Sequence, residues 1–230
     1  MALPKSLQEA VKPVTIVTGH YGVGKTNLTL NMARDLAAAG FEVRVADLDI
    51  VNPYFRSSEY GALLEEAGVS LVAPVMANSS LDTPSLSAAI EGSIEWARED
   101  NRILLIDVGG DDAGATALGR YTHLIDAERS TMVYVINAYR NLTQDPAEAV
   151  EILKEIEFTA RMKAQAIVNN SHLHNETDVS VVEGAQAFGE QVAEAAGIPL
   201  VAQTAPAALA DKANITNCYP VQKLVKTPWE

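Results

Sequence analysis

Cysteine, positive charge and long apolar runs are all scarce in this sequence, and each shortage excludes a class of protein. Cys218 is the only cysteine among 230 residues. The chain therefore has no internal disulfide and no CxxC pair that would hold zinc or an iron–sulfur cluster within one chain. We interpret Cys218 as a small residue of ordinary packing, and one cysteine per subunit shared across a dimer is the alternative.

The charge balance and the short apolar runs limit the expected partners. Seventeen Lys and Arg residues stand against thirty Asp and Glu, a formal net charge of −13. An acidic surface repels phosphate backbones, so we expect no nucleic acid as the main partner. The runs "RILLIDV" and "MVYVI" have the length of core strands, and no stretch resembles a signal peptide or a membrane span. We therefore expect a cytoplasmic protein without a stable membrane anchor.

Short β-branched runs alternate with longer helical stretches, which predicts an α/β fold over a single domain of residues 1–230. Apolar strands separated by helices are typical of a mostly parallel sheet, here of about seven strands, with helices on both faces. Ligands of such sheets lie beyond the carboxyl ends of the strands. The expected strands are Val14–Thr18, Glu42–Ala46, Ser70–Ala73, Arg102–Asp107, Thr131–Asn137, Ala164–Asn169 and Pro199–Ala202. The expected helices are Thr26–Ala39, Ser85–Glu99, Pro146–Arg161 and Val179–Ala196.

A phosphate-binding loop follows the first expected strand. The pattern G-x-x-x-x-G-K-S/T is matched at every fixed position by Gly19-His20-Tyr21-Gly22-Val23-Gly24-Lys25-Thr26. It lies between an apolar run and a helix, the context that the motif requires. Its glycines let backbone N–H groups converge on an anion at the start of the helix. We predict that Gly19 to Asn27 bind nucleotide phosphates, with Lys25 bridging the β- and γ-phosphates and the Thr26 hydroxyl reaching Mg²⁺.

Two expected strands end in aspartate. Asp47 and Asp49 are two residues apart, so they point the same way while the strand persists. Asp107 follows four apolar residues and begins the pattern D-x-x-G, in which the N–H of Gly110 can sense a γ-phosphate and reset the following loop. An aspartate at such a strand end can hold Mg²⁺ directly or through water. Ordinary turn chemistry is the alternative for each site taken alone.

The loop, the two aspartate-bearing strand ends and their order resemble the MinD/ParA branch of P-loop ATPases, related to the nitrogenase iron protein and the arsenite-pump ATPases. The resemblance covers about Val14 to Ala213. It implies a single-domain P-loop NTPase with ATP and Mg²⁺ as ligands and an ATP-dependent homodimer that acts on a protein partner. By position, Asp49 matches the residue that orients the attacking water, with Asp47 nearby and Asp107 serving the metal.

The loop departs from that family at two positions. Family members with the loop G-K-G-G-x-G-K-S/T carry a lysine where this chain has His20, and that lysine contacts the phosphates of the partner subunit. Tyr21 replaces the second glycine of the family loop. Histidine is shorter and only partly charged near neutral pH, so the contact in trans should be weaker. We expect the loop to hold ATP and basal turnover to be slow.

Three further sites complete the candidate list. In relatives an asparagine at a late strand end bonds adenine, and we choose Asn169 over Asn170, since an amide offers both a donor and an acceptor. The chain has no N-K-x-D quartet, which disfavours guanine. Arg140 follows the strand that we expect beside the Asp107 strand. It can stand in for the missing lysine at the γ-phosphate, and a surface or interface ion pair is the alternative.

Two histidines close together, His172 and His174, raise the possibility of a metal site. They lie in a polar stretch without a third ligand, so we interpret both as facing solvent.

Two kinds of function fit these residues. The first is an ATPase switch whose loops are held by ATP and released by hydrolysis, for a protein partner to read. The second is an ATP-dependent carboxylate- or amide-activating ligase of the dethiobiotin or cobyrinate type, with Arg56, Tyr54 and Tyr60 supplying a substrate pocket. A binding-only module is disfavoured, because the chain keeps the residues expected for hydrolysis, namely Lys25, Thr26, Asp49 and Asp107. We favour the switch.

Overall fold

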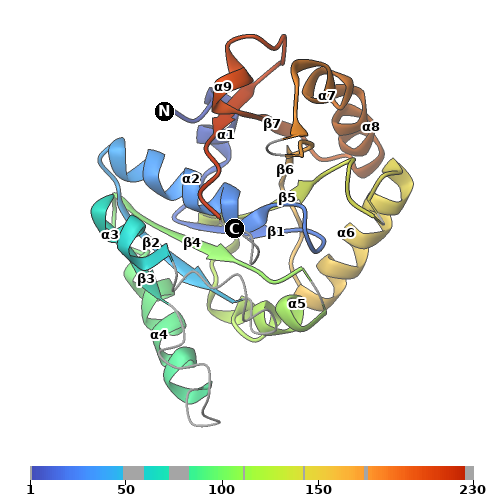
Figure 1. Cartoon of the computed structure of the whole chain (residues 1–230). Helices are drawn as coiled ribbons and strands as arrows, with labels where there is room; N and C mark the ends of the chain where they lie inside the picture. Colours follow the sequence, from blue (N-terminus) through green and yellow to red (C-terminus); the bar gives the residue numbers. More distant parts are fainter. Residues whose placement is uncertain are drawn as a thin grey trace.

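A computed structural model describes residues 2–48, 60–72, 83–110, 112–141, 143–173 and 176–225, with the backbone alone for 83–87. Eight strands form one sheet in the order β3-β2-β4-β1-β5-β6-β7-β8 (Figure 1). Every neighbouring pair is parallel. The strands are β1 (Val14–Thr18), β2 (Glu42–Asp47), β3 (Val69–Val72), β4 (Arg102–Asp107), β5 (Ser130–Ile136), β6 (Ala166–Asn169), β7 (Leu200–Pro206) and β8 (Cys218–Val221).

Helices occupy the connections between these strands. Their ends follow local signals: α6 begins where the Asp145 side chain accepts a hydrogen bond from the N–H of Ala147 and ends at Arg161, which has a φ of 55°. The helices are α1 (Lys5–Ala10), α2 (Lys25–Ala38), α3 (Gly61–Glu66), α4 (Thr83–Trp96), α5 (Asp112–Gly119), α6 (Pro146–Ala160), α7 (Val179–Gly184), α8 (Gln186–Ala196) and α9 (Ala207–Ala210).

Both faces of the sheet are buried under helices. Val17 packs with Leu7 of α1, Leu28 of α2 and Leu64 of α3 in one core. Its neighbour in β1, Ile16, points to the other face. There it joins a second core that includes Ile90 of α4, Leu118 of α5, Leu153 of α6 and Val192 of α8. The predicted α/β fold with a parallel sheet covered on both faces is therefore confirmed.

The structure adds the helices α1, α3, α5 and α9 to the expected elements and extends β7 to Pro206, and it differs further in two places. An eighth strand, β8, lies at the edge of the sheet, and its Pro220 and polar flanks concealed it in the sequence. The helix expected over Val179–Ala196 is two helices that meet at Ala185. The carbonyl of Ala185 accepts a hydrogen bond from the side chain of Asn169, which draws this part of the chain onto the end of β6.

The helix α2 runs from the phosphate loop at its first residue to a glycine turn at its last. Leu28, Met32 and Leu36 recur at helical spacing and are all buried against the sheet. The helix starts at the phosphate loop and stops at Gly40, whose φ is 96°. There the N–H of Phe41 bonds the carbonyl of Leu36 at 3.2 Å, and Gly40 bonds Ala37 at 3.0 Å, which is the Schellman arrangement.

Candidate nucleotide-binding site

The phosphate loop joins β1 to α2 at the carboxyl edge of the sheet. Gly19, Gly22 and Gly24 have φ values of 150°, 77° and 93°, a region that side chains disfavour. A methyl group on Gly19 would collide with the carbonyl oxygen of Val135 in β5, and one on Gly24 would collide with the amide of Asn170. The loop can follow this path only with glycine at these positions.

Lys25, the first residue of α2, folds back over the loop. Its side chain is 7% exposed, and its Nζ donates a hydrogen bond of 3.0 Å to the carbonyl oxygen of His20. The same Nζ lies next to Gly110: a Cβ built on that glycine would be 2.7 Å from it and 2.5 Å from the backbone nitrogen of Tyr21. The D-x-x-G element therefore touches the phosphate loop.

Two carboxylates lie side by side next to this loop. Asp47 and Asp107 are paired in the β2–β4 register, and Asp107 is paired with Val17 in β1. Paired residues of parallel strands point to one face, so both carboxylates lie on the face of Val17, which α2 covers. They are 6% and 4% exposed. Together with the half-buried hydroxyl of Thr26, these oxygens are the ligand type that Mg²⁺ prefers.

Asp49 lies outside the described residues, so its predicted role stays a prediction. Within the described part of the chain, no cluster of three or more His, Cys, Asp or Glu side chains could hold a metal ion by itself.

Arg140 lies against the phosphate loop, but the strand that leads to it has a different neighbour from the expected one. The strand before it, β5, pairs with β1 and not with the Asp107 strand β4, because strand order is not encoded in sequence order. A Cβ built on Gly22 would lie 3.8 Å from the Cδ of Arg140. Among the described residues, its buried Nε has no hydrogen-bond partner. A guanidinium in this position can reach an anion on the loop.

Asn170 holds the loop from the opposite side. Its Nδ2 donates 2.7 Å to the carbonyl of Val23, and its Oδ1 accepts from the hydroxyl of Thr204 at 2.5 Å. The same Oδ1 lies 3.1 Å from Nε2 of His172, and because an amide oxygen only accepts, that nitrogen carries the hydrogen. Residue pattern alone indicated none of these partners.

His172 was expected to face solvent, and that expectation is wrong. The side chain is 1% exposed, and its own carbonyl accepts a hydrogen bond of 3.3 Å from Asn137. Burial is possible because the bond to Asn170 satisfies Nε2 inside the protein. His174 lies outside the described residues.

The amide of Asn169 is already used inside the fold. Its Nδ2 donates to the carbonyl of Ala185 at 2.9 Å and to Oε1 of Gln203 at 3.0 Å, and its Oδ1 accepts from Ser171 at 2.5 Å. To bond an adenine edge, Asn169 would have to exchange one of these partners. The adenine contact therefore stays a prediction.

His20 and Tyr21 form the outer surface of the loop. Tyr21 is 59% exposed. His20 is half-buried, and burial together with the nearby Lys25 ammonium lowers the pKa of its imidazole below the ordinary value of 6.5. Without a bound anion, this histidine is neutral at neutral pH.

Residues 222–225 form a strap that runs along the first turns of α2, just beyond the loop, as the end of the chain after β8 does in Figure 1. Asn27 donates to the carbonyl of Gln222 at 3.0 Å and accepts from the N–H groups of Leu224 at 2.8 Å and Val225 at 3.3 Å. Asn31 exchanges two hydrogen bonds of 2.9 Å with the backbone of Gln222. Both polar atoms of the Asn27 side chain are thus hydrogen-bonded to the strap. Its predicted contact with phosphate would therefore be made by its backbone N–H.

One residue of the alternative ligase pocket is unavailable. Tyr60 is 5% exposed and packs in the core beneath α2. Tyr54 and Arg56 lie outside the described residues.

A glycine loop between β1 and α2, a lysine closing it and carboxylates at neighbouring strand ends define a P-loop nucleotide-binding protein. The chain belongs to the CbiA family, the CobQ/CobB/MinD/ParA nucleotide-binding domain, whose family model matches residues 14–179. The resemblance to the MinD/ParA branch is thereby confirmed at the level of the family. No curated protein sequence matches the chain.

Solved structures with this fold include FtsY from Mycoplasma mycoides, with a TM-score of 0.55 at 22% identity, covering 81% of this chain and 58% of FtsY. Chloroplast FtsY from Physcomitrella patens has a TM-score of 0.56 at 16% identity, and the match covers 85% of this chain and 63% of that protein. Signal Recognition Particle 54 kDa protein from Aeropyrum pernix K1, in complex with GDP, has a TM-score of 0.54 at 16% identity. This match covers 81% of this chain and 40% of that protein. This chain thus spans less than two thirds of each, and the likeness is one of fold. In the described part of the chain, no helix is both long and apolar enough to cross a bilayer.

Proposed function

We propose that this protein binds ATP with Mg²⁺, hydrolyses it slowly and acts as a nucleotide-driven switch on a protein partner in the cytoplasm. The observation that carries the proposal is the contact between the loop and the D-x-x-G element: Lys25, His20 and Gly110 meet at one point. A γ-phosphate entering there would take the Lys25 ammonium from the His20 carbonyl and would bond the N–H of Gly110. Bound triphosphate would therefore move the segment after Asp107.

The described residues support a division of roles. The loop N–H groups and Lys25 bind the phosphates, and Thr26, Asp47 and Asp107 would hold Mg²⁺, which neutralises charge on the phosphate oxygens when bound. In hydrolysis the oxygen of a water forms a bond to the γ-phosphorus while the bond to the β–γ bridging oxygen breaks, leaving ADP and phosphate. We assign the orientation of that water to Asp49, on the strength of the family pattern.

Arg140 is the candidate for charge stabilisation within the subunit. It lies beside Gly22, and within the described residues its Nε has no hydrogen-bond partner. A stabilising arginine contributes about 10³–10⁵ to turnover in P-loop enzymes. In the family pattern a trans lysine does part of this work, and His20 replaces it here.

The exposure of Tyr21 supports a dimer in which two ATP-bound copies meet at this face. A homodimer joined loop to loop would bury this ring and would place His20 at the seam. The acidic composition supports a protein partner over nucleic acid.

Isothermal titration calorimetry with ATP, ADP and GTP tests the assignment. Lys25→Ala should weaken ATP and ADP binding by about tenfold to a hundredfold or more, since it removes charge-assisted bonds to phosphate. Lys5→Ala, whose side chain is 88% exposed, is the matched control and should bind normally. Retention of affinity within about threefold in Lys25→Ala would count against the loop. Tighter binding of GTP than of ATP would reject the choice of base.

A further inference from the structure

A cavity of about 550 Å³ lies at the end of the molecule opposite the phosphate loop. It is bounded by the amino ends of β1 and β4, the last turn of α2 and the start of the chain. Its size falls within the range of small-molecule sites. It lies on the wrong edge of the sheet to be part of the nucleotide site, since ligands of such sheets sit at the carboxyl edge.

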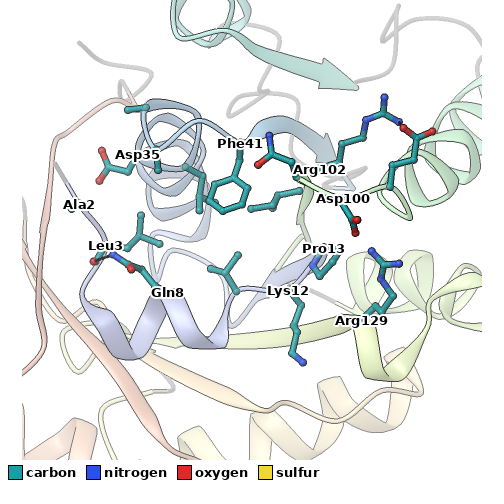
Figure 2. Close-up of a pocket in the computed structure, with 17 residues that line it drawn as sticks. Ala2, Leu3, Gln8, Lys12, Pro13, Asp35, Phe41, Asp100, Arg102 and Arg129 are labelled. Carbon is teal, nitrogen blue, oxygen red and sulfur yellow. Dashed lines mark hydrogen bonds and ion pairs between the residues drawn. The ribbon is translucent and has the colours of Figure 1, made fainter.

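Apolar atoms make up most of the wall of this cavity. Leu3, Leu36 and Ile103 are buried behind it, and the ring of Phe41 points into it, 39% exposed (Figure 2). In the described part of the chain, Phe41 is one of three large apolar side chains that remain exposed. Covering this ring would remove apolar surface from water, which favours an apolar ligand.

The wall is fixed by backbone geometry. Phe41 is held by the Schellman bond to Leu36 that ends α2. On the facing turn, Asn101 adopts a φ of 64° and donates from its side chain to the carbonyl of Gly40 at 3.0 Å. Its own carbonyl accepts the N–H of Glu42 at 2.9 Å. The two turns that carry the apolar wall are therefore bonded to each other, and the site exists before any ligand binds.

One end of the cavity carries a positive excess. Arg129 and Asp100 lie there in Figure 2, and Lys12 lies beside them. Among the described residues, neither Arg129 nor Lys12 forms an ion pair with a carboxylate, although Lys12 donates to the carbonyl of Glu128 at 3.1 Å. With Asp100, these side chains leave one net positive charge, which suits a monoanion.

The remaining charged groups of the wall are already engaged. Arg102 is paired with Glu99 at 2.6 Å and with Glu42 at 3.2 Å. Asp35 accepts the hydroxyl of Tyr219 at 3.0 Å. Over the whole wall the cations Lys12, Arg102 and Arg129 are balanced by the carboxylates Asp35, Glu99 and Asp100, so the positive excess is local to the Arg129 end.

We propose that this cavity is a second ligand site, which binds a small organic monoanion with an aromatic or aliphatic body. The carbon skeleton lies against Phe41, Leu36 and Ile103, and the anionic group lies at Arg129 and Lys12. The site is independent of the nucleotide, so it stands whether or not the proposed ATPase activity does.

Fluorescence titration with 8-anilinonaphthalene-1-sulfonate tests this site, because the probe is an aromatic monoanion of suitable size. The folded protein should bind one probe per chain. Arg129→Gln and Phe41→Ser should each weaken binding by about tenfold, the loss expected when one charged or apolar contact is removed. The matched controls Arg120→Gln and Phe158→Ser change an exposed arginine and a phenylalanine that is 87% exposed elsewhere, and they should change nothing.

Three further arms separate the alternatives. N-phenyl-1-naphthylamine has the same body without the sulfonate, and its weaker binding should not depend on Arg129. Saturating ATP with Mg²⁺ should leave the probe bound, and Lys25→Ala should bind it normally. Displacement by ATP, equal loss in Phe158→Ser, or full affinity in both Arg129→Gln and Phe41→Ser would each overturn the proposal. Thermal unfolding of every variant excludes a misfolded chain, and Arg129→Gln decides the question if Phe41→Ser fails to fold.

Discussion

The side-chain amide of Asn170 donates a hydrogen bond of 2.7 Å to the carbonyl oxygen of Val23, across 147 residues of sequence. The bond ties the end of β6 to the middle of the phosphate loop. It turns a carbonyl of the loop toward the protein, which leaves the neighbouring N–H groups free to face an anion. Thr204 and His172 hold the amide in this orientation from behind.

Replacing this amide with a carboxylate should damage the loop. In Asn170→Asp an acceptor faces the Val23 carbonyl, so the free energy of unfolding should fall by about 1–3 kcal/mol and ATP affinity by about tenfold. Chemical denaturation and calorimetry measure the two effects. Asn214→Asp is the exposed control and should alter neither. Unchanged ATP affinity in Asn170→Asp would mean that the loop keeps its shape without this bond.

Loss of Asp107 should separate metal binding from phosphate binding. Asp107→Asn keeps the shape of a side chain that is 4% exposed and removes its charge. We expect the gain in ATP affinity on adding Mg²⁺ to fall by about tenfold, with affinity in EDTA unchanged. The comparison is one calorimetric titration with the metal and one without it. Equal loss in both would assign Asp107 to the fold and not to the metal.

Nucleotide binding should be linked to protonation of His20. Burial and the nearby Lys25 lower the pKa of this imidazole below its ordinary value in the free protein, which favours the neutral form. Phosphate oxygens favour the protonated form and raise that pKa, so protons should be taken up on binding. Apparent binding enthalpies near pH 6 should therefore vary with the ionisation enthalpy of the buffer. His20→Asn should abolish the variation, and its persistence would place the titrating group elsewhere.

Restoring the family loop should strengthen the dimer. His20→Lys combined with Tyr21→Gly gives a side chain that reaches the partner's phosphates and removes the bulk of a ring that is 59% exposed. ATP-dependent dimerisation and phosphate release should then rise together. Arg140→Ala should lower turnover more in the natural protein than in the double variant. Light scattering with a non-hydrolysable ATP analogue follows assembly, and a monomeric natural protein with ordinary turnover would reject the dimer and favour the ligase.

The strap should contribute to stability through its hydrogen bonds. Asn27→Ala leaves the N–H groups of Leu224 and Val225 and the carbonyl of Gln222 without that side chain. Since a polar group left unsatisfied costs at most about 1–3 kcal/mol and these groups are only partly buried, the free energy of unfolding should fall by about 1–3 kcal/mol. Asn214→Ala, at an exposed position, provides the reference. If Asn27→Ala unfolds at the same denaturant concentration as the natural protein, the hydrogen bonds of the strap do not contribute to stability.

Local patterns were enough for the parts of the site that are close in sequence. The bounds of β1 and β4 match the prediction, because each is an apolar run that ends in a turn signal. The contact between Gly110 and the loop needed the structure, because β1 and β4 are neighbours in the sheet and not in the sequence. Pairing between distant residues leaves no local trace. Asn170 with Val23 and the place of Arg140 beside β1 both needed the three-dimensional order of the strands.

The hydrogen bonds of the strap also impose an order on biosynthesis. Asn27 is translated 195 residues before Gln222, the first partner that satisfies its amide. During elongation the helix that carries Lys25 can pack its apolar side, but Asn27 and Asn31 still lack their partners in Gln222, so we expect that end of the helix to be held less firmly. If the loop binds phosphate as proposed, tight binding should therefore need the completed sheet, and a ribosome-bound fragment ending before β8 should bind no nucleotide.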